Sequence, residues 1–99
     1  MKVLWTEQAY TRLAEIGDFI AKENPIAAAR LRKKLIERAE SLSTFPNRGR
    51  RPPELPGSEL REIIHDVYRI VYRVRGKSIE VLTVFEGHRQ LPEEDLPQD

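Results

Sequence analysis

Apolar residues at the start of the chain follow the spacing of a short strand and then of a helix. Val3 and Trp5 fall on one side of an extended run, which favours a first strand over Lys2 to Trp5. Thr6 can then cap a helix, since its hydroxyl can accept a hydrogen bond from a free backbone amide of the first turn. Apolar positions repeat behind it at steps of three and four residues, and they are Ala9, Leu13, Ile16 and Ile20. This pattern predicts a helix near residues 6–23.

A second helix follows almost at once. Pro25 disfavours helical conformation in Asn24, the residue before it, and is itself well suited to the first position of a new helix. The next apolar stripe has helical spacing and contains Ala28, Leu31, Leu35, Ala39 and Leu42. We therefore predict a helix near residues 25–43. Because the break between the two helices is short, they should form an antiparallel hairpin.

The second half of the chain has the pattern of strands. Residues 45–58 (FPNRGRRPPELPGS) hold four prolines and two glycines, which predicts a loop. Three strand-like runs follow, with turns at residues 65–66 and 75–78, and they are Glu59–Ile64, Val67–Val74 and Ile79–Phe85. The order β-α-α-β-β-β predicts an α+β domain with the helical hairpin packed on a mainly antiparallel sheet.

The last two runs differ in how their apolar residues alternate. In the middle run one predicted face is apolar, with Tyr68, Ile70, Tyr72 and Val74, and the other carries arginines, with Val67, Arg69, Val71 and Arg73. We assign both tyrosines to the core. Strict alternation in the last run sets Ile79, Val81 and Phe85 against Leu82 and Val84. Since both faces are apolar, this run is predicted to be a central strand.

Composition narrows the class of protein. The chain has 99 residues, 39% hydrophobic and 33% charged, which fits one soluble globular domain. No apolar run is long enough to span a membrane, and the first residues do not have the pattern of a signal peptide, so we expect a cytoplasmic protein without membrane contacts. There is no cysteine, and the two histidines lie in no metal-ligand spacing, so no metal site is expected.

The net charge of +1 hides an asymmetry between the body of the chain and its end. The last eight residues, PEEDLPQD, carry a charge of −4, so residues 1–91 carry +5. A modestly basic body attracts polyanions, whether nucleic acid or an acidic protein segment. We predict one domain over residues 1–91, followed by an acidic, flexible tail over residues 92–99.

Six stretches of the sequence resemble the RelE/ParE superfamily of bacterial toxins. They occur in the order VLWTEQA, KENPIAAARL, FPNRGR, LRE, YRIVYRV and VLTVFEGHR, and together span most of residues 3–89. The resemblance implies the RelE-like fold, in which the first strand joins the last and the sheet order is 1-4-3-2. It also implies the growth-inhibiting toxin of a type II toxin-antitoxin system, in hetero-oligomeric complex with an antitoxin from the same operon.

The superfamily contains two kinds of toxin. The helix junction, the long second helix and the FPNRGR loop are more similar to the ParE-like, plasmid stabilisation type, which implies binding and inhibition of DNA gyrase without cofactor or catalytic residues. The resemblance then assigns the cationic side chains to partner binding, since they could meet carboxylates of the antitoxin or phosphates. These residues are Arg48, Arg50, Arg51, Arg69, Arg73 and Arg89.

The alternative is a metal-independent ribonuclease that cuts mRNA on the ribosome, as RelE-like and YoeB-like members do. RNA cleavage through the 2′-hydroxyl needs a base, cations that neutralise the phosphate, and an acid for the leaving oxygen. The candidates are Glu54 as base, Arg61 and Arg69 as phosphate clamps, and His88 as acid. The strand LREIIHD departs from the RelE branch because it has no lysine. A third alternative is a toxin-like chain that has lost activity and serves as the antitoxin's partner.

Overall fold

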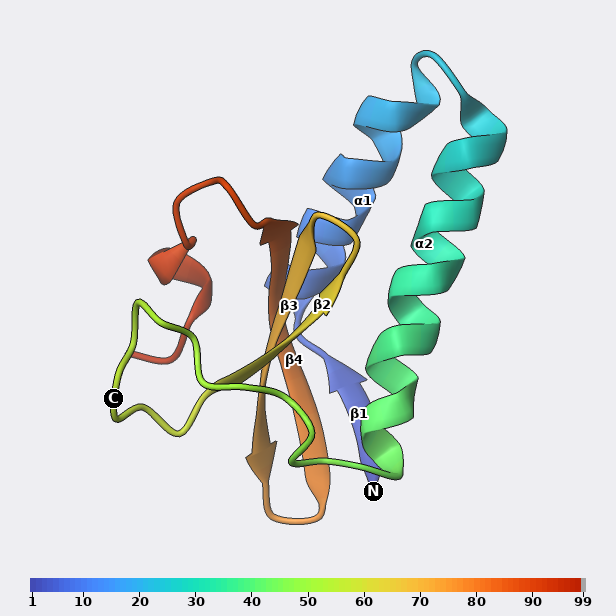
Figure 1. Ribbon diagram of the computed structural model, residues 1–99. Helices are drawn as coiled ribbons and strands as arrows, with labels where there is room; N and C mark the ends of the chain where they lie inside the picture. Colours follow the sequence, from blue (N-terminus) through green and yellow to red (C-terminus); the bar gives the residue numbers. More distant parts are fainter. Residues whose placement is uncertain (99) are drawn as a thin grey trace.

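Strand β4 (Ser78–Glu86) lies inside a four-stranded sheet whose order is β1-β4-β3-β2. The computed structural model describes residues 1–98 (Figure 1). β3 (Tyr68–Arg75) pairs antiparallel with β4 and with β2 (Arg61–His65), whereas β1 (Lys2–Trp5) runs parallel to β4. The predicted order 1-4-3-2 and the internal position of the last strand are confirmed.

The two helices form the predicted antiparallel hairpin. α1 spans Glu7–Ala21 and α2 spans Pro25–Glu40, followed by a 3-10 turn over Ser41–Ser43. The Thr6 hydroxyl accepts the amide of Ala9 at 3.1 Å, and the Asn24 side chain accepts the amide of Ala27 at 3.0 Å, so each helix begins at a side-chain cap. The turn between the helices projects beyond the end of the sheet (Figure 1).

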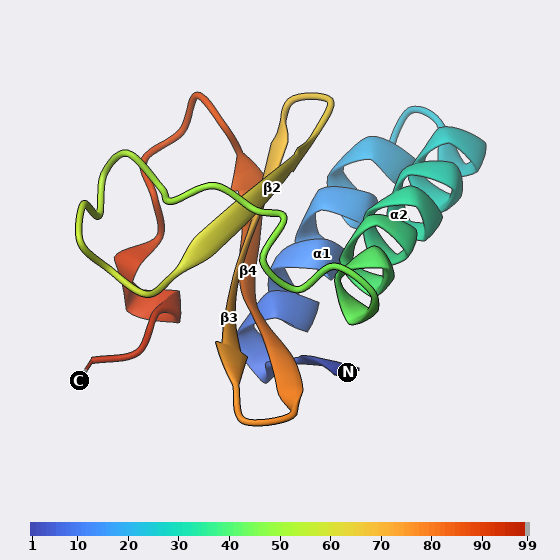
Figure 2. The ribbon, with the colours of Figure 1, turned by 60° about the horizontal axis from the view of Figure 1, so that its bottom comes forward.

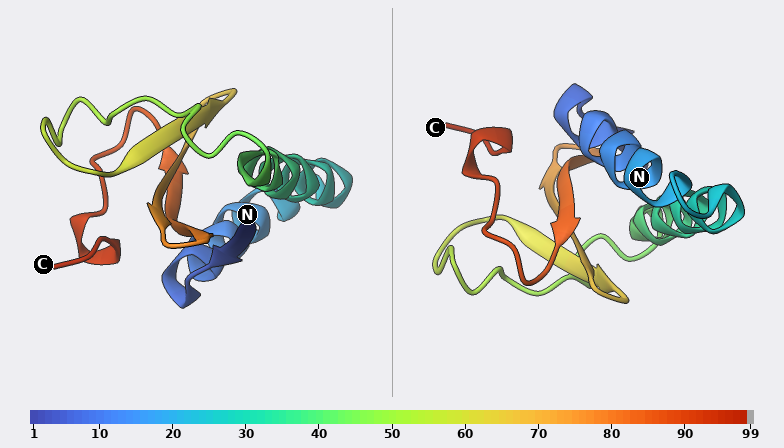
Figure 3. Two further views of the ribbon diagram at one scale, coloured as in Figure 1. Left: turned by 90° about the horizontal axis from the view of Figure 1, so that it is seen from below. Right: turned by 90° about the horizontal axis from the view of Figure 1, so that it is seen from above.

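The helical hairpin covers one face of the sheet, and a loop and the C-terminal segment cover the other (Figures 2 and 3). The larger core lies under the helices and includes Leu35, Ile70, Tyr72 and Val81, all fully buried. A smaller core lies on the opposite face. It is formed by Leu60, Val71, Leu82, Phe85 and Leu91, with Leu55 and Leu96 packed against it. Tyr68 and Tyr72 are core residues, as predicted.

One assignment of faces was wrong. Phe85 belongs to the smaller core together with Leu82, and Val84 belongs to the larger core with Ile79 and Val81. The reason is a register shift: Val71 pairs with Thr83, but the next residue, Tyr72, pairs with Val81. The extra residue in β4 inverts the alternation beyond it, as a β-bulge does.

The acidic end of the chain lies across the smaller core. After β4 the chain passes through buried Leu91 and a 3-10 turn over Glu93–Asp95. The Asp95 carboxylate, whose side chain is 6% exposed, accepts a hydrogen bond from Arg12 Nε at 2.6 Å and one from the Thr83 hydroxyl at 2.9 Å. The separate, flexible tail over residues 92–99 stays a prediction, and Asp99 lies outside the described residues.

Candidate functional site

Arg69, the second residue of β3, is held by two carboxylates on the sheet face away from the helices. Its Nη2 atom lies 2.6 Å from Oε1 of Glu62 and 2.6 Å from Oε1 of Glu54. Nε donates to Glu62 at 2.9 Å, and Nη1 donates to Glu54 at 2.7 Å. The Arg69 side chain is only 8% exposed, and its guanidinium lies over the Phe85 ring at 4.9 Å. Its charge is therefore compensated within the chain.

Glu62 links this arginine to the basic loop. Its side chain is fully buried, and its second oxygen accepts a hydrogen bond from Arg50 Nε at 2.8 Å. The backbones of the same two residues pair in both directions, so Arg50 extends the edge of the sheet beside β2. The four charges of Arg50, Glu54, Glu62 and Arg69 form one network with a formal charge of zero, and it ties the loop to the sheet.

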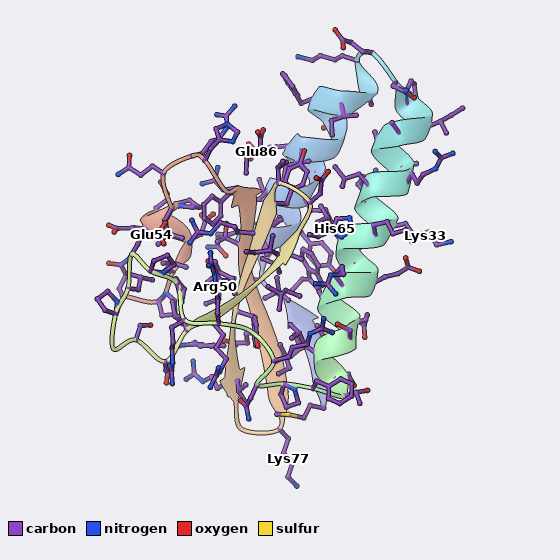
Figure 4. The ribbon with its side chains drawn as sticks, in the orientation of Figure 1. Lys33, Arg50, Glu54, His65, Lys77 and Glu86 are labelled. Atoms are coloured by element: carbon purple, nitrogen blue, oxygen red, sulfur yellow. The ribbon has the colours of Figure 1, made fainter. Side chains whose placement is uncertain are left out.

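Glu54 is an anion in this arrangement. Its hydrogen bonds from Arg69 are the largest cause that lowers its pKa, from 4.5 to about 2. The same pairing raises the pKa of Arg69. A carboxylate in a proline-rich loop is usually solvated, but both oxygens of Glu54, whose position in the loop is labelled in Figure 4, accept hydrogen bonds from Arg69.

Tyr72 holds the other end of the loop. Its phenol donates to the carbonyl of Pro46 at 2.8 Å and accepts the amide of Gly49 at 3.0 Å. Burial is the main cause that raises the pKa of Tyr72. A Cβ atom at position 49 would lie 2.7 Å from the phenol oxygen and 2.8 Å from the carbonyl oxygen of Glu62. The glycine of the FPNRGR stretch is thus required by the close approach of this loop to the sheet.

The structure brings together only two of the four ribonuclease candidates, Glu54 and Arg69. Arg61 pairs across the strands with Tyr72, whose ring lies in the helix-facing core, so it lies on the other face of the sheet from Arg69. Arg61 donates to the carbonyl of Gly49 at 2.8 Å. His88 is 71% exposed, with Nε2 3.4 Å from a Glu86 oxygen. Two arginines on opposite faces cannot hold one phosphate group.

The six arginines assigned to partner binding differ in exposure. Arg69 is buried, and Arg73 is largely covered, with Nε 2.7 Å from Glu80. Arg50 is exposed but paired with Glu62. The other three are exposed, and they are Arg48, Arg51 and Arg89. Their roles in partner binding stay predictions.

Two acidic residues that hold arginines in the structure, Glu62 and Asp95, were not identified from the sequence. Glu62 shares its face of the LREIIHD strand with the apolar residues Leu60 and Ile64, and an acidic residue among apolar ones on a strand face signals a paired charge. Asp95 gave no such signal, because the acidic tail around it has the composition of a solvated segment. Within residues 1–98, no group of three or more potential metal ligands occurs, and no helix is long and apolar enough to cross a membrane.

The mixed four-stranded sheet with one helical hairpin defines a RelE/ParE-like toxin fold. A solved structure described as the chromosomal ParDE toxin-antitoxin system from P. aeruginosa has this fold, with a TM-score of 0.74 and 27% identity over 87% of this chain and 95% of that chain. Two relatives are named as toxins. Y4kP of Sinorhizobium fredii is 36% identical over 93% of this chain and 94% of its own length. RelE2 of Caulobacter vibrioides is 38% identical over 89% of this chain and 97% of its own length.

The family model for the ParE toxin of the type II toxin-antitoxin system parDE matches residues 3–91. The chain belongs to this family and is the toxin component of a type II toxin-antitoxin system. Membership implies an antitoxin as its partner.

Proposed function

We propose that the toxin acts in the cytoplasm by binding DNA gyrase and that the antitoxin silences it by covering its surface. The observation that carries the proposal is the state of Arg69 and Glu54. An arginine bonded to two carboxylates is not available to hold a phosphate, and a carboxylate with a pKa of about 2 is a poor base at neutral pH. The residues that RNA cleavage would need are therefore used to fix the loop, which favours a binding protein over a nuclease.

A groove beside α1 is the surface that best suits the antitoxin. It has a volume of about 250 Å³, lies between α1 and the ends of β3 and β4, and has an apolar floor that includes Ile16, Tyr68 and Phe85. Phe19 lines it and is 70% exposed, while Arg89 stands on its rim. Such a groove fits apolar side chains of a segment that orders on binding, with a carboxylate meeting Arg89.

The antitoxin contact can be tested by co-expression with the antitoxin from the same operon. Phe19→Ala should weaken the complex at least tenfold, since a large apolar side chain buried in a groove is a typical binding hot spot. Ile26→Ala is the matched control, because Ile26 is equally exposed but does not line the groove. Equal affinities of the two variants would place the antitoxin elsewhere.

The target is tested with purified toxin in two assays, gyrase supercoiling and mRNA cleavage on translating ribosomes. We expect inhibited supercoiling and intact mRNA. His88→Ala should retain most of the inhibition, because an exposed rim contact contributes no more than about 1–2 kcal/mol. His65→Ala is the control for loss of a histidine. Codon-phased mRNA cuts that vanish in His88→Ala, with supercoiling unaffected, would establish the ribonuclease instead. Folded protein that is inert in both assays would be the inactive antitoxin partner.

A further inference from the structure

Three arginines lie along the line where the end of α2 meets the edge of the sheet. Arg38 of α2 donates to the carbonyl of Ile64 in β2 at 3.0 Å. Arg48 of the loop donates to the hydroxyl of Ser41 at 2.9 Å, and Arg61 of β2 donates to the carbonyl of Gly49 at 2.8 Å. We name these three residues the arginine seam. His65 lies at the same line, next to α2 (Figure 4).

The contacts of the seam are physically connected. The Ser41 hydroxyl that accepts from Arg48 donates to the backbone carbonyl of Arg38 at 2.6 Å, and Gly49 directly follows Arg48. Arg61 and Arg48 both lie near enough to the Tyr72 phenol to favour its ionised form, which partly opposes the effect of burial on the pKa of Tyr72. The Arg48 and Arg61 guanidinium groups therefore lie close to the start of the basic loop, and the Arg38 guanidinium lies farther along β2, at Ile64.

No member of the seam has a carboxylate within 4.0 Å among residues 1–98, although Arg12, Arg50, Arg69, Arg73 and Arg89 all do. The end of α2 offers only about half a negative charge to set against three positive ones. Each guanidinium also has five N–H donors, of which the chain uses one. The seam therefore holds unused charge and unused donors.

An exposed aromatic residue lies one turn of chain before Arg48 of the seam. Phe45 is 62% exposed, and its carbonyl accepts the amide of Arg48 at 3.2 Å. An exposed ring beside a row of guanidinium groups is the arrangement with which proteins hold single-stranded nucleic acid, because phosphates pair with arginines and a base stacks on the ring. An acidic peptide would use the arginines but would have no need of the ring.

We propose that the arginine seam and Phe45 form a binding site for single-stranded nucleic acid, with phosphates on Arg38, Arg48 and Arg61 and a base on the Phe45 ring. None of these four residues lines the groove beside α1. The site depends neither on the gyrase target nor on the antitoxin contact.

The test is fluorescence anisotropy with labelled dT12 and U12 oligonucleotides and the full chain at several salt concentrations. The seam variant is R38Q/R48Q/R61Q, and the matched control is K33Q/R75Q/K77Q, which loses the same charge at exposed positions; Lys33 and Lys77 point away from the sheet (Figure 4). The seam variant should bind at least tenfold more weakly. The slope of log affinity against log salt should fall by about 2, as expected for three phosphates on a single strand. The control should change less than threefold.

Two single variants keep the test valid if the triple variant does not fold. R48Q removes an exposed guanidinium, and F45A removes the ring and should weaken binding about tenfold. Y10A is the control for loss of an exposed aromatic ring. The relative affinities for dT12 and U12 tell whether the site takes DNA or RNA. Equal losses in the seam variant and its charge control, no binding by the unaltered chain, or tighter binding of an oligoglutamate peptide than of either oligonucleotide would overturn the proposal.

Discussion

The phenol of Tyr72 and the amide of Gly49 form a hydrogen bond of 3.0 Å between the centre of the sheet and the basic loop. The same phenol donates to Pro46, so one fully buried side chain fixes two points of the FPNRGR stretch. This pair explains why the loop keeps a defined path although it has no regular secondary structure.

Tyr72→Phe should lower the free energy of unfolding by about 1–3 kcal/mol, because the buried amide of Gly49 loses its acceptor. Urea titration followed by circular dichroism measures the change. Tyr10→Phe is the control, since Tyr10 is exposed and should shift stability by less than about 0.5 kcal/mol. Equal effects of the two variants would show that the buried hydrogen bond contributes nothing.

Gly49→Ala should destabilise the protein by about 1–3 kcal/mol, because the added methyl group meets the Tyr72 phenol and a backbone carbonyl at less than 3.0 Å. Thermal unfolding is the measurement. Gly17→Ala is the contrasting variant. Its added Cβ meets only the flexible side chain of Arg32, which can move aside, so the cost should be smaller. A larger loss at position 17 would contradict this interpretation.

Arg69→Met should destabilise the protein by about 3–5 kcal/mol, because it leaves Glu62 buried with only the exposed Arg50 as its partner. The double variant Arg69→Met/Glu62→Leu should recover much of that loss, since it removes both buried charges. Arg50→Gln, at the exposed end of the network, should cost no more than about 1 kcal/mol. Glu62→Leu alone completes the cycle, and chemical denaturation of the unaltered protein, the two single variants and the double variant gives the coupling energy between Arg69 and Glu62. A coupling near zero would contradict the prediction.

The Glu54–Arg69 pair should make stability depend on pH in the acidic range. The folded-state pKa of Glu54 is about 2 against an ordinary 4.5, so its contribution is fully present above pH 4.5 and is lost as the pH falls toward 2. The unfolding free energies of the unaltered protein and of Glu54→Gln should therefore differ at pH 7 and converge below pH 4.5. The difference should be modest and should shrink with salt, because the Glu54 side chain is 37% exposed. A constant difference from pH 7 to pH 2 would exclude this assignment.

Asp95→Ala should loosen the end of the chain. It removes the nearest carboxylate partner of Arg12 and leaves the hydroxyl of Thr83, a fully buried residue, without its acceptor. Hydrogen exchange should accelerate in residues 91–98 more than in β3. Glu94→Ala is the matched control. Glu94 is exposed, and its Oε1 atom lies 3.8 Å from Arg12 Nη2, which is too long for a strong ion pair. Unchanged exchange in both variants would support the flexible tail that composition predicts.

The sequence pattern was sufficient for the helices, the strands and the central place of the last strand, and the full sheet order 1-4-3-2 came from the resemblance to the RelE/ParE superfamily. Each helix has a capping side chain and a clear apolar stripe, and β4 is apolar on both faces, as a central strand is. The extra residue at Leu82 could not be predicted, because nothing in the local pattern marks a bulge whose cause is the fit between β3 and β4. The pattern could mark Glu62 as a paired charge, but it could not identify the partners in either charged cluster. Glu62 with Arg69 and Asp95 with Arg12 are contacts between segments that lie apart in the chain, and residue spacing carries no record of them.

The parallel pairing of β1 with β4 determines how much of the chain must be synthesised before the sheet can form. Val3 pairs with Ile79 and Trp5 with Val81, so the first strand has no strand to pair with until β4 has been made. During synthesis the helical hairpin emerges with its apolar stripe uncovered, and contacts this distant in sequence form late. A ribosome that stops before residue 86 releases a chain without a completed sheet. The parallel pairing of β1 with β4 thus delays completion of the sheet until the whole of β4 has been synthesised.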